Sequence, residues 1–191
     1  MVNNPGHHHA GGSTRSLLDA ERVLTEIGLK KGDAFLDAGS GSGYLSIAAS
    51  AIVGNEGQIH AVDIDETSID TLKTEISSRK ITNLTATVAD VTGKTPLPGK
   101  SIDICLMANV LHGFVENQEV AGVMNELSRV LRTGATLAVV EFKKLENIPG
   151  PPLDIKLSPE QVAAIITPYH YRQQRVVEVG AYHYAAIFSK E

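Results

Sequence analysis

Apolar and β-branched residues gather into five short runs between residues 34 and 142, and longer stretches of helical periodicity separate them. The five runs are AFLDAG, QIHAVD, LTATVAD, IDICLMAN and TLAVVEF. Their nearly continuous apolar character is typical of strands buried on both faces, as in a parallel sheet covered by helices. The intervening YLSIAASAIV, ETSIDTLKTEISSRK and NQEVAGVMNELSRVL are long enough to be crossover helices. The pattern therefore predicts an α/β fold with a doubly wound sheet.

The segments outside this alternation predict two further helices and a closing hairpin. Before the first run, STRSLLDAERVLTEIGLK predicts a helix that starts near Ser13 or Ser16 and ends at Gly28 or shortly after. Between the third and fourth runs, GKTPLPGKS is too short and too rich in proline and glycine to predict a full helix. After the fifth run, SPEQVAAIITPYH predicts a helix that Ser158 caps. The last two runs, YRQQRVVEV and AYHYAAIFSK, flank Gly180 and predict a hairpin.

Length and composition fit one domain. At 191 residues and 42% hydrophobic, the chain can bury one core, so residues 1–191 are interpreted as a single domain in which 1–12 form a flexible lid or tail. The net charge of -5 and the scattered basic pairs argue against a nucleic-acid partner. No apolar run is long enough for a bilayer, so we expect a soluble, cytoplasmic protein without a membrane partner. The sequence predicts no particular oligomeric state.

The stretch FLDAGSGSGYL is the most informative, because a predicted strand runs into Gly39, Gly41 and Gly43 and then into a helix. Glycine permits positive φ and leaves no Cβ atom between backbone and ligand, while the helix N terminus presents free N–H groups. The second strand ends at Asp63, where a carboxylate can accept hydrogen bonds from both hydroxyls of a ribose. The third ends at Asp90, on the same edge of the sheet. Together these signals predict a site for a nucleotide-like ligand at that edge.

Four motifs together resemble those of class I S-adenosylmethionine-dependent methyltransferases. DAGSGSG matches the first motif of that family, AVDID the second and VAD the third, and ELSRVLRTGATLAVVEF is similar to the segment that leads into the fifth strand. The resemblance implies a Rossmann-like, seven-stranded sheet with a C-terminal antiparallel strand, and S-adenosylmethionine as the cofactor. Thr133 and Ala135 replace the usual proline and second glycine of the turn before the fifth strand. A dinucleotide site would need G-x-G-x-x-G, and Tyr44 occupies the place of its last glycine.

The resemblance also implies which residues bind the cofactor. The expected positions are Asp37, Gly39, Ser40, Gly41, Gly43, Asp63, Ile64, Asp90, Val91 and Asn109. The glycine-turn backbone would hold the methionine moiety, with Asp37 supporting its amino group. Asp63 would hold the ribose, and Ile64 would pack on the adenine. Asp90 would bind the adenine amino group with Val91 beside it, and Asn109 would border the methyl end.

The acceptor side is less well defined by the sequence. Three catalytic candidates are expected at the same sheet edge: His112 in the loop NVLHGF after the fourth strand, Glu141 at the end of the fifth strand, and His183 at the start of the last. Each has a plainer alternative: His112 could bond a loop carbonyl, Glu141 could pair with a lysine, and His183 could be packed within a strand. A base is needed only if the acceptor carries a proton. A small-molecule acceptor is expected, and the methylated atom, O, N, S or C, stays open.

The run His7 to His9 lies in NPGHHHAGG and allows several interpretations. It could belong to a lid over the methyl site, to an idle tail or to a tag remnant. Consecutive histidines cannot all point at one ion without a folded surrounding, so no specific metal site is predicted. The sequence thus favours an S-adenosylmethionine-dependent methyltransferase of a small molecule. The alternative is a non-catalytic module that binds S-adenosylmethionine, or a metal through the His-rich segment.

Overall fold

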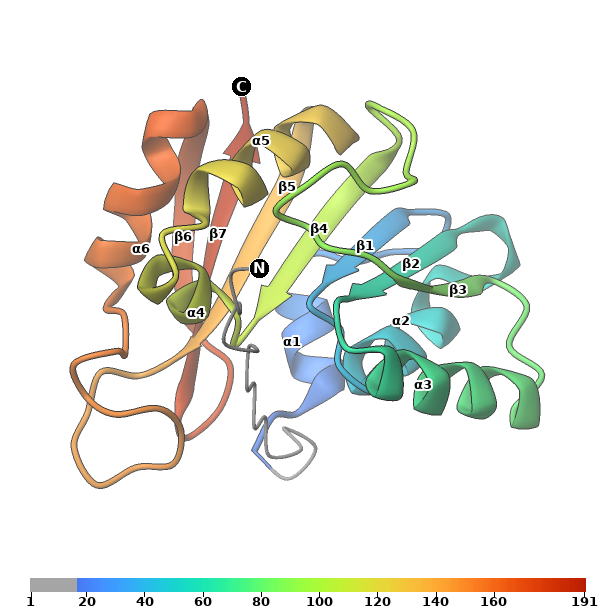
Figure 1. Ribbon diagram of the computed structural model, residues 1–191, viewed down its shortest axis with the longest axis horizontal. Coiled ribbons are helices and arrows are strands. Elements are labelled where there is room, and N and C mark those ends of the chain that lie inside the picture. Colours follow the sequence, from blue (N-terminus) through green and yellow to red (C-terminus); the bar gives the residue numbers. More distant parts are fainter. Residues whose placement is uncertain (1–16) are drawn as a thin grey trace, which may run out of the picture.

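The computed structural model describes residues 17–191, which form a seven-stranded sheet with helices on both faces (Figure 1). The strands are β1 (Ala34–Ala38), β2 (Gln58–Asp63), β3 (Leu84–Val88), β4 (Ile102–Ala108), β5 (Leu131–Phe142), β6 (Tyr171–Glu178) and β7 (His183–Lys190). The helices are α1 (Ala20–Glu26), α2 (Tyr44–Val53), η2 (Gly54–Glu56), α3 (Glu66–Ser78), α4 (Leu111–Glu116), α5 (Val120–Val130), α6 (Pro159–Ile166) and η3 (Thr167–Tyr169). The sheet order is β3-β2-β1-β4-β5-β7-β6, with β7 antiparallel to β5 and β6. The predicted fold class is confirmed.

Two helix boundaries differ from the sequence-based expectation. Ser13 and Ser16 lie outside the described residues, but α1 begins only at Ala20, because the Asp19 carboxylate caps it by accepting the N–H of Arg22 at 3.1 Å. The expected start near Ser13 or Ser16 is therefore wrong. The stretch after β4 was expected to be a loop, yet it forms α4.

The predicted cap of α6 is confirmed. Ser158 and Gln161 form the capping box that starts α6, with the serine side chain and the glutamine side chain each bonding the other's backbone N–H. Cys105, the single cysteine of the chain, is fully buried in β4 between β1 and β5. Burial, with the charge of Asp37 as a second cause, raises the pKa of its thiol.

The strands divide the apolar interior into two cores. On β5, Leu137 and Val139 belong to the core covered by α4, α5 and α6, whereas Ala138 and Val140 belong to the core beneath α1, α2 and α3. Figure 1 shows α4, α5 and α6 on the near side of the sheet. Because side chains alternate along a strand, Glu141 and the next residue, Phe142, face opposite sides at the end of β5.

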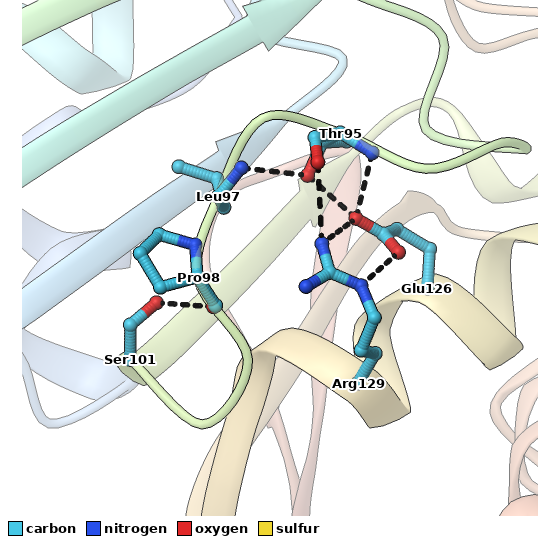
Figure 2. A network of polar contacts seen from close by, with 6 residues as sticks. All are labelled: Thr95, Leu97, Pro98, Ser101, Glu126 and Arg129. Atoms are coloured by element: carbon cyan, nitrogen blue, oxygen red, sulfur yellow. Dashed lines mark hydrogen bonds and ion pairs between the residues drawn. The ribbon is translucent and has the colours of Figure 1, made fainter.

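Side chains rather than a helix hold the connection from β3 to β4 (Figure 2). The Oε1 atom of Glu126, on α5, accepts hydrogen bonds from Thr95 N at 2.8 Å and from Thr95 Oγ1 at 2.5 Å. Arg129 donates to both carboxylate oxygens of Glu126, at 2.6 and 2.7 Å. Thr95 and Glu126 are buried, so this network fixes the loop that contains Asp90.

We expect Glu126→Ala to lower the free energy of unfolding by about 2 to 3 kcal/mol, because it leaves the buried N–H and hydroxyl of Thr95 unpaired. Equilibrium urea unfolding measures the change. Glu75→Ala is the matched control, since Glu75 pairs with Arg79 on the surface of α3 at 2.8 Å and should contribute less than about 0.5 kcal/mol. Equal losses of unfolding free energy in Glu126→Ala and Glu75→Ala would contradict the role given to Glu126 in holding the loop.

Candidate functional site

The turn between β1 and α2 contains Gly39, Gly41 and Gly43, with φ values of 80°, 52° and 77°. A Cβ atom on Gly43 would collide with Leu72, and one on Gly39 would lie 2.7 Å from Val110 Cγ1. A Cβ atom on Gly41 would meet open space. No side chain caps the N terminus of α2, which follows the turn. Two of the glycines thus serve close packing, and Gly41 faces the space that a ligand can enter.

Asp63 lies beside this turn, and Asp90 follows the strand next to it. The Oδ2 atom of Asp63 accepts the N–H of Gly41 at 2.7 Å, and its Oδ1 atom accepts the N–H of Asp65 at 2.9 Å. The N–H of Ala89 donates to the Asp63 carbonyl at 3.0 Å, which places Asp90 next to Asp63. Strands β1, β2 and β3 therefore deliver their terminal groups to one edge, as the sequence predicted.

The apolar residues expected to pack on an adenine differ in exposure. Ile64 follows Asp63 and is 49% exposed, so its side chain is available to a ligand. Val91 follows Asp90 and is buried in the core that α5 covers. Val91 thus lies beneath the neighbouring loop, while Ile64 lies on the surface.

Asp37, the penultimate residue of β1, is a buried carboxyl group with 2% exposure. Its Oδ2 atom accepts the hydroxyl of Ser46 at 2.5 Å. Burial raises the pKa of Asp37 to about 6, the Ser46 hydrogen bond opposes this rise, and the nearby charge of Asp63 adds to it. Sequence reasoning missed Ser46; the only signal was a polar residue within the apolar helix YLSIAASAIV.

His112 and Glu141 form a second polar pair, where β5 ends beneath α4. The Oε1 atom of Glu141 accepts the N–H of His112 at 3.1 Å, and its Oε2 atom lies 2.8 Å from His112 Nδ1. The Glu141 side chain is 1% exposed and that of His112 is 17% exposed. Burial lowers the pKa of His112, but the hydrogen bond and charge of Glu141, with the charge of Glu116, outweigh it and leave the pKa raised.

Asn109 and His183 meet on the other side of β5. Asn109 follows β4 with φ of 58°, and its Nδ2 atom lies 3.2 Å from His183 Nε2. His183 is fully buried, and its ring centroid lies 4.2 Å from that of Phe142 with the two rings tilted by 42°. Burial, aided by the charge of Lys143, lowers the pKa of His183 to about 4, so the ring is neutral at physiological pH. Asn109 Oδ1 and His183 Nδ1 are buried without a hydrogen-bond partner in the described part of the chain.

These groups suit S-adenosylmethionine chemically. Open space above Gly41, carboxylates at Asp37, Asp63 and Asp90, and the unpartnered Oδ1 of Asn109 share one sheet edge. A ligand with a ribose, an ammonium group and a sulfonium offers donors and positive charge to such acceptors.

Comparison with known proteins identifies the family. Residues 29–179 match the methyltransferase-domain family. The chain belongs to this family. The sequence-based prediction of an S-adenosylmethionine-dependent methyltransferase, with S-adenosylmethionine as the cofactor, is confirmed at the level of the family.

Individual relatives of this methyltransferase agree with the family match. An S-adenosylmethionine-dependent methyltransferase from Aquifex aeolicus is 31% identical with a TM-score of 0.85, over 95% of this chain and 94% of that chain. A putative type 11 methyltransferase from Sulfolobus solfataricus shares the fold at 19% identity and a TM-score of 0.74, over 92% and 94% of the chains. The ubiquinone/menaquinone biosynthesis C-methyltransferase UbiE of Marinomonas sp. is 27% identical over 125 residues, 65% of this chain and 49% of the relative. The chain spans about half the length of the curated relatives it matches.

Other candidate sites in the methyltransferase are weaker. A cavity of about 310 Å³ lies at the opposite sheet edge, but Arg132 pairs there with Asp103, which also accepts the N–H of Ala34 at 2.9 Å. Within residues 17–191, no three His, Cys, Asp or Glu side chains could hold a metal ion together, and no helix is long and apolar enough to cross a membrane. The His7 to His9 run and the expected lid or tail, 1–12, lie outside the described residues.

Substituting two of the glycines should separate ligand binding from folding. Gly41→Ala should cost only about 1 kcal/mol of stability, from backbone strain, yet weaken S-adenosylhomocysteine binding at least tenfold because its methyl group enters the ligand space. Gly43→Ala should destabilise the fold more strongly, because its Cβ atom collides with Leu72. Thermal unfolding and calorimetric titration measure the two effects; undiminished binding by Gly41→Ala would be the contrary result.

Proposed function

We propose that this chain transfers the methyl group of S-adenosylmethionine to a small-molecule acceptor, with the cofactor held by the ten positions that the family resemblance names. The hydrogen bond from Gly41 N to Asp63 Oδ2 is the observation that supports this most, because it joins a ribose-binding carboxylate to a turn that leaves space for a ligand. The names of the UbiE relatives refer to ubiquinone and menaquinone biosynthesis, which favours a small organic acceptor over a macromolecule.

The cofactor residues act by holding and orienting. S-adenosylmethionine supplies an electrophilic methyl group on a sulfonium, so much of the catalysis is positioning in a dry site. Each Asp63 oxygen accepts one backbone N–H and retains a second lone pair for a ribose hydroxyl. In this proposal Asp37 attracts the ammonium group, and the unpaired Asn109 Oδ1 is the acceptor that borders the methyl end.

The acceptor side is assigned to His112, Glu141 and His183. The partly exposed His112 faces the acceptor, and Glu141 acts through its two contacts to His112. His183 acts through Asn109, whose amide it contacts while buried against Phe142.

Asp63→Ala should weaken S-adenosylmethionine binding at least tenfold, because two buried hydrogen bonds to a ribose are worth more than about 1.4 kcal/mol. Isothermal titration calorimetry with S-adenosylmethionine and S-adenosylhomocysteine measures it. Asp70→Ala is the control, since Asp70 lies on the exposed side of α3 and bonds only Lys73 among the described side chains.

Two outcomes bear on the proposal as a whole. Failure of the folded wild-type protein to bind either compound would refute it. Binding of both compounds, with methyl turnover on any small acceptor, would exclude the alternative of a non-catalytic binding module.

Cofactor affinity should rise as pH passes through about 6. Asp37 is mostly protonated below its pKa of about 6 and charged above it, and only the carboxylate attracts an ammonium group. Calorimetry between about pH 5 and about pH 8 should show tightening of up to about tenfold per pH unit below the pKa and a plateau above it. Asp37→Asn should flatten this dependence. His112→Gln should retain this pH dependence, which shows that the dependence comes from Asp37 and not from His112.

A further inference from the structure

We propose that His112 is the general base of the methyl transfer, that Glu141 positions it, and that the acceptor is a phenol or enol hydroxyl which must lose its proton to react. This inference rests on the proposed function and adds to it the acceptor class and the path of the proton. Transfer of a sulfonium methyl group needs no base when the acceptor is already nucleophilic. A histidine that the structure holds in position as a base therefore indicates an acceptor that carries a proton.

Both carboxylate oxygens of Glu141 contact His112. Oε1 accepts the backbone N–H of His112 at 3.1 Å, and Oε2 lies 2.8 Å from the ring atom Nδ1. The carboxylate is 1% exposed, and the described residues offer it no Lys or Arg ion-pair partner. A buried carboxylate needs hydrogen-bond donors, and these two contacts supply them.

This geometry fixes the proton on the imidazole. A carboxylate is an acceptor only, so Nδ1 carries the hydrogen and Nε2 carries the lone pair in the neutral ring. Among residues 17–191 no hydrogen bond engages Nε2, and the side chain keeps 17% exposure. Nε2 is therefore the atom available to take a proton from an acceptor.

Neighbouring charges favour His112 over His183 as the base. Glu141 from β5 and Glu116 from α4 raise the pKa of His112 against the effect of burial. From β7, Tyr184 pairs with Glu141 across the sheet; burial raises its hydroxyl pKa, and Glu141 and then Glu160 of α6 add to it. His183 is fully buried, its Nε2 contacts Asn109, and its pKa of about 4 leaves it a weak base.

The strength of this base suits an acidic hydroxyl. A phenol with a pKa near about 10 lies within a few units of an imidazole above about 6.5, whereas an aliphatic alcohol does not. The hydroxyl proton passes to Nε2 and both O–H electrons stay on oxygen. That oxygen forms the new C–O bond as the C–S bond breaks, with the C–S electron pair left on a neutral thioether. His112 then returns the proton to solvent.

Glu141→Gln tests the positioning without removing the side chain. The backbone N–H of His112 is always a donor, so the introduced amide must turn its oxygen toward that N–H and its NH2 group toward Nδ1. The neutral ring must then hold its hydrogen on Nε2, where it cannot accept a proton. Nitrogen NMR of labelled histidine should show the Nδ1–H form in the wild type, the Nε2–H form in Glu141→Gln, and a lower pKa of His112 in the variant. An unchanged tautomer and pKa would overturn the inference.

Binding of 4-nitrophenol tests the acceptor class without turnover, because this phenol absorbs visible light only when it is ionised. Added to protein saturated with S-adenosylhomocysteine, it should bind in its ionised form, with the proton on the protein. Glu141→Gln and His112→Gln should each weaken this binding at least tenfold. Glu146→Gln is the matched control, since Glu146 lies exposed in the loop after β5 and should bind as the wild type does.

The result for the cofactor product separates the two proposals. Failure of the wild type to bind S-adenosylhomocysteine would overturn the proposed function. If all variants bind S-adenosylhomocysteine alike, two outcomes would overturn only the assignment of the base and of the acceptor class. One is that the wild type does not bind the phenol, and the other is that Glu141→Gln and His112→Gln bind it as tightly as the wild type does.

Discussion

The parallel order of β3, β2, β1, β4 and β5 is the constraint on which the site depends. The chain passes from β1 through α2 to β2 on one side, whereas β4 pairs with β1 on the other. Connections that leave a sheet in opposite directions open a crevice at the carboxyl ends of the strands. Every group assigned to the cofactor follows from this: Asp37 near the end of β1, Asp63 ending β2, Asp90 after β3 and Asn109 after β4. None of these residues needs a flexible loop to reach the others.

The second organising feature is the alternation of side chains at the end of β5. Glu141 faces the core beneath α4 and contacts His112, while the next residue, Phe142, faces the opposite core and its ring contacts that of His183. The three candidates that the sequence places at one sheet edge are thus divided: His112 and Glu141 form a pair on one face, and His183 contacts Phe142 on the other. One imidazole is paired with a carboxylate and partly exposed, and the other is neutral and fully buried.

The sequence predicted the sheet, and the arrival of three strand ends at one edge, because both depend on local signals. Apolar runs mark strands, and glycines that need positive φ mark the turn at Gly39 to Gly43. The contacts that the sequence did not reveal join residues far apart in the chain. Glu126 holding Thr95, Ser46 bonding Asp37, and Glu141 bonding the first turn of α4 depend on tertiary packing. The start of α1 failed for a local reason, since several polar residues precede the apolar face and Asp19 alone supplies the cap.

The position of Cys105 gives the protein a built-in reporter of the opening of one of its two cores. Its thiol lies in β4, paired in register with Leu36 of β1 and Leu137 of β5, and it is the sole thiol of the chain. The side chain belongs to the core covered by α4, α5 and α6, so an alkylating reagent can reach it only when these helices separate from the sheet, and burial also disfavours the reactive thiolate. The rate of labelling under native conditions therefore follows the opening of the helix layer over the central strands, with no added probe.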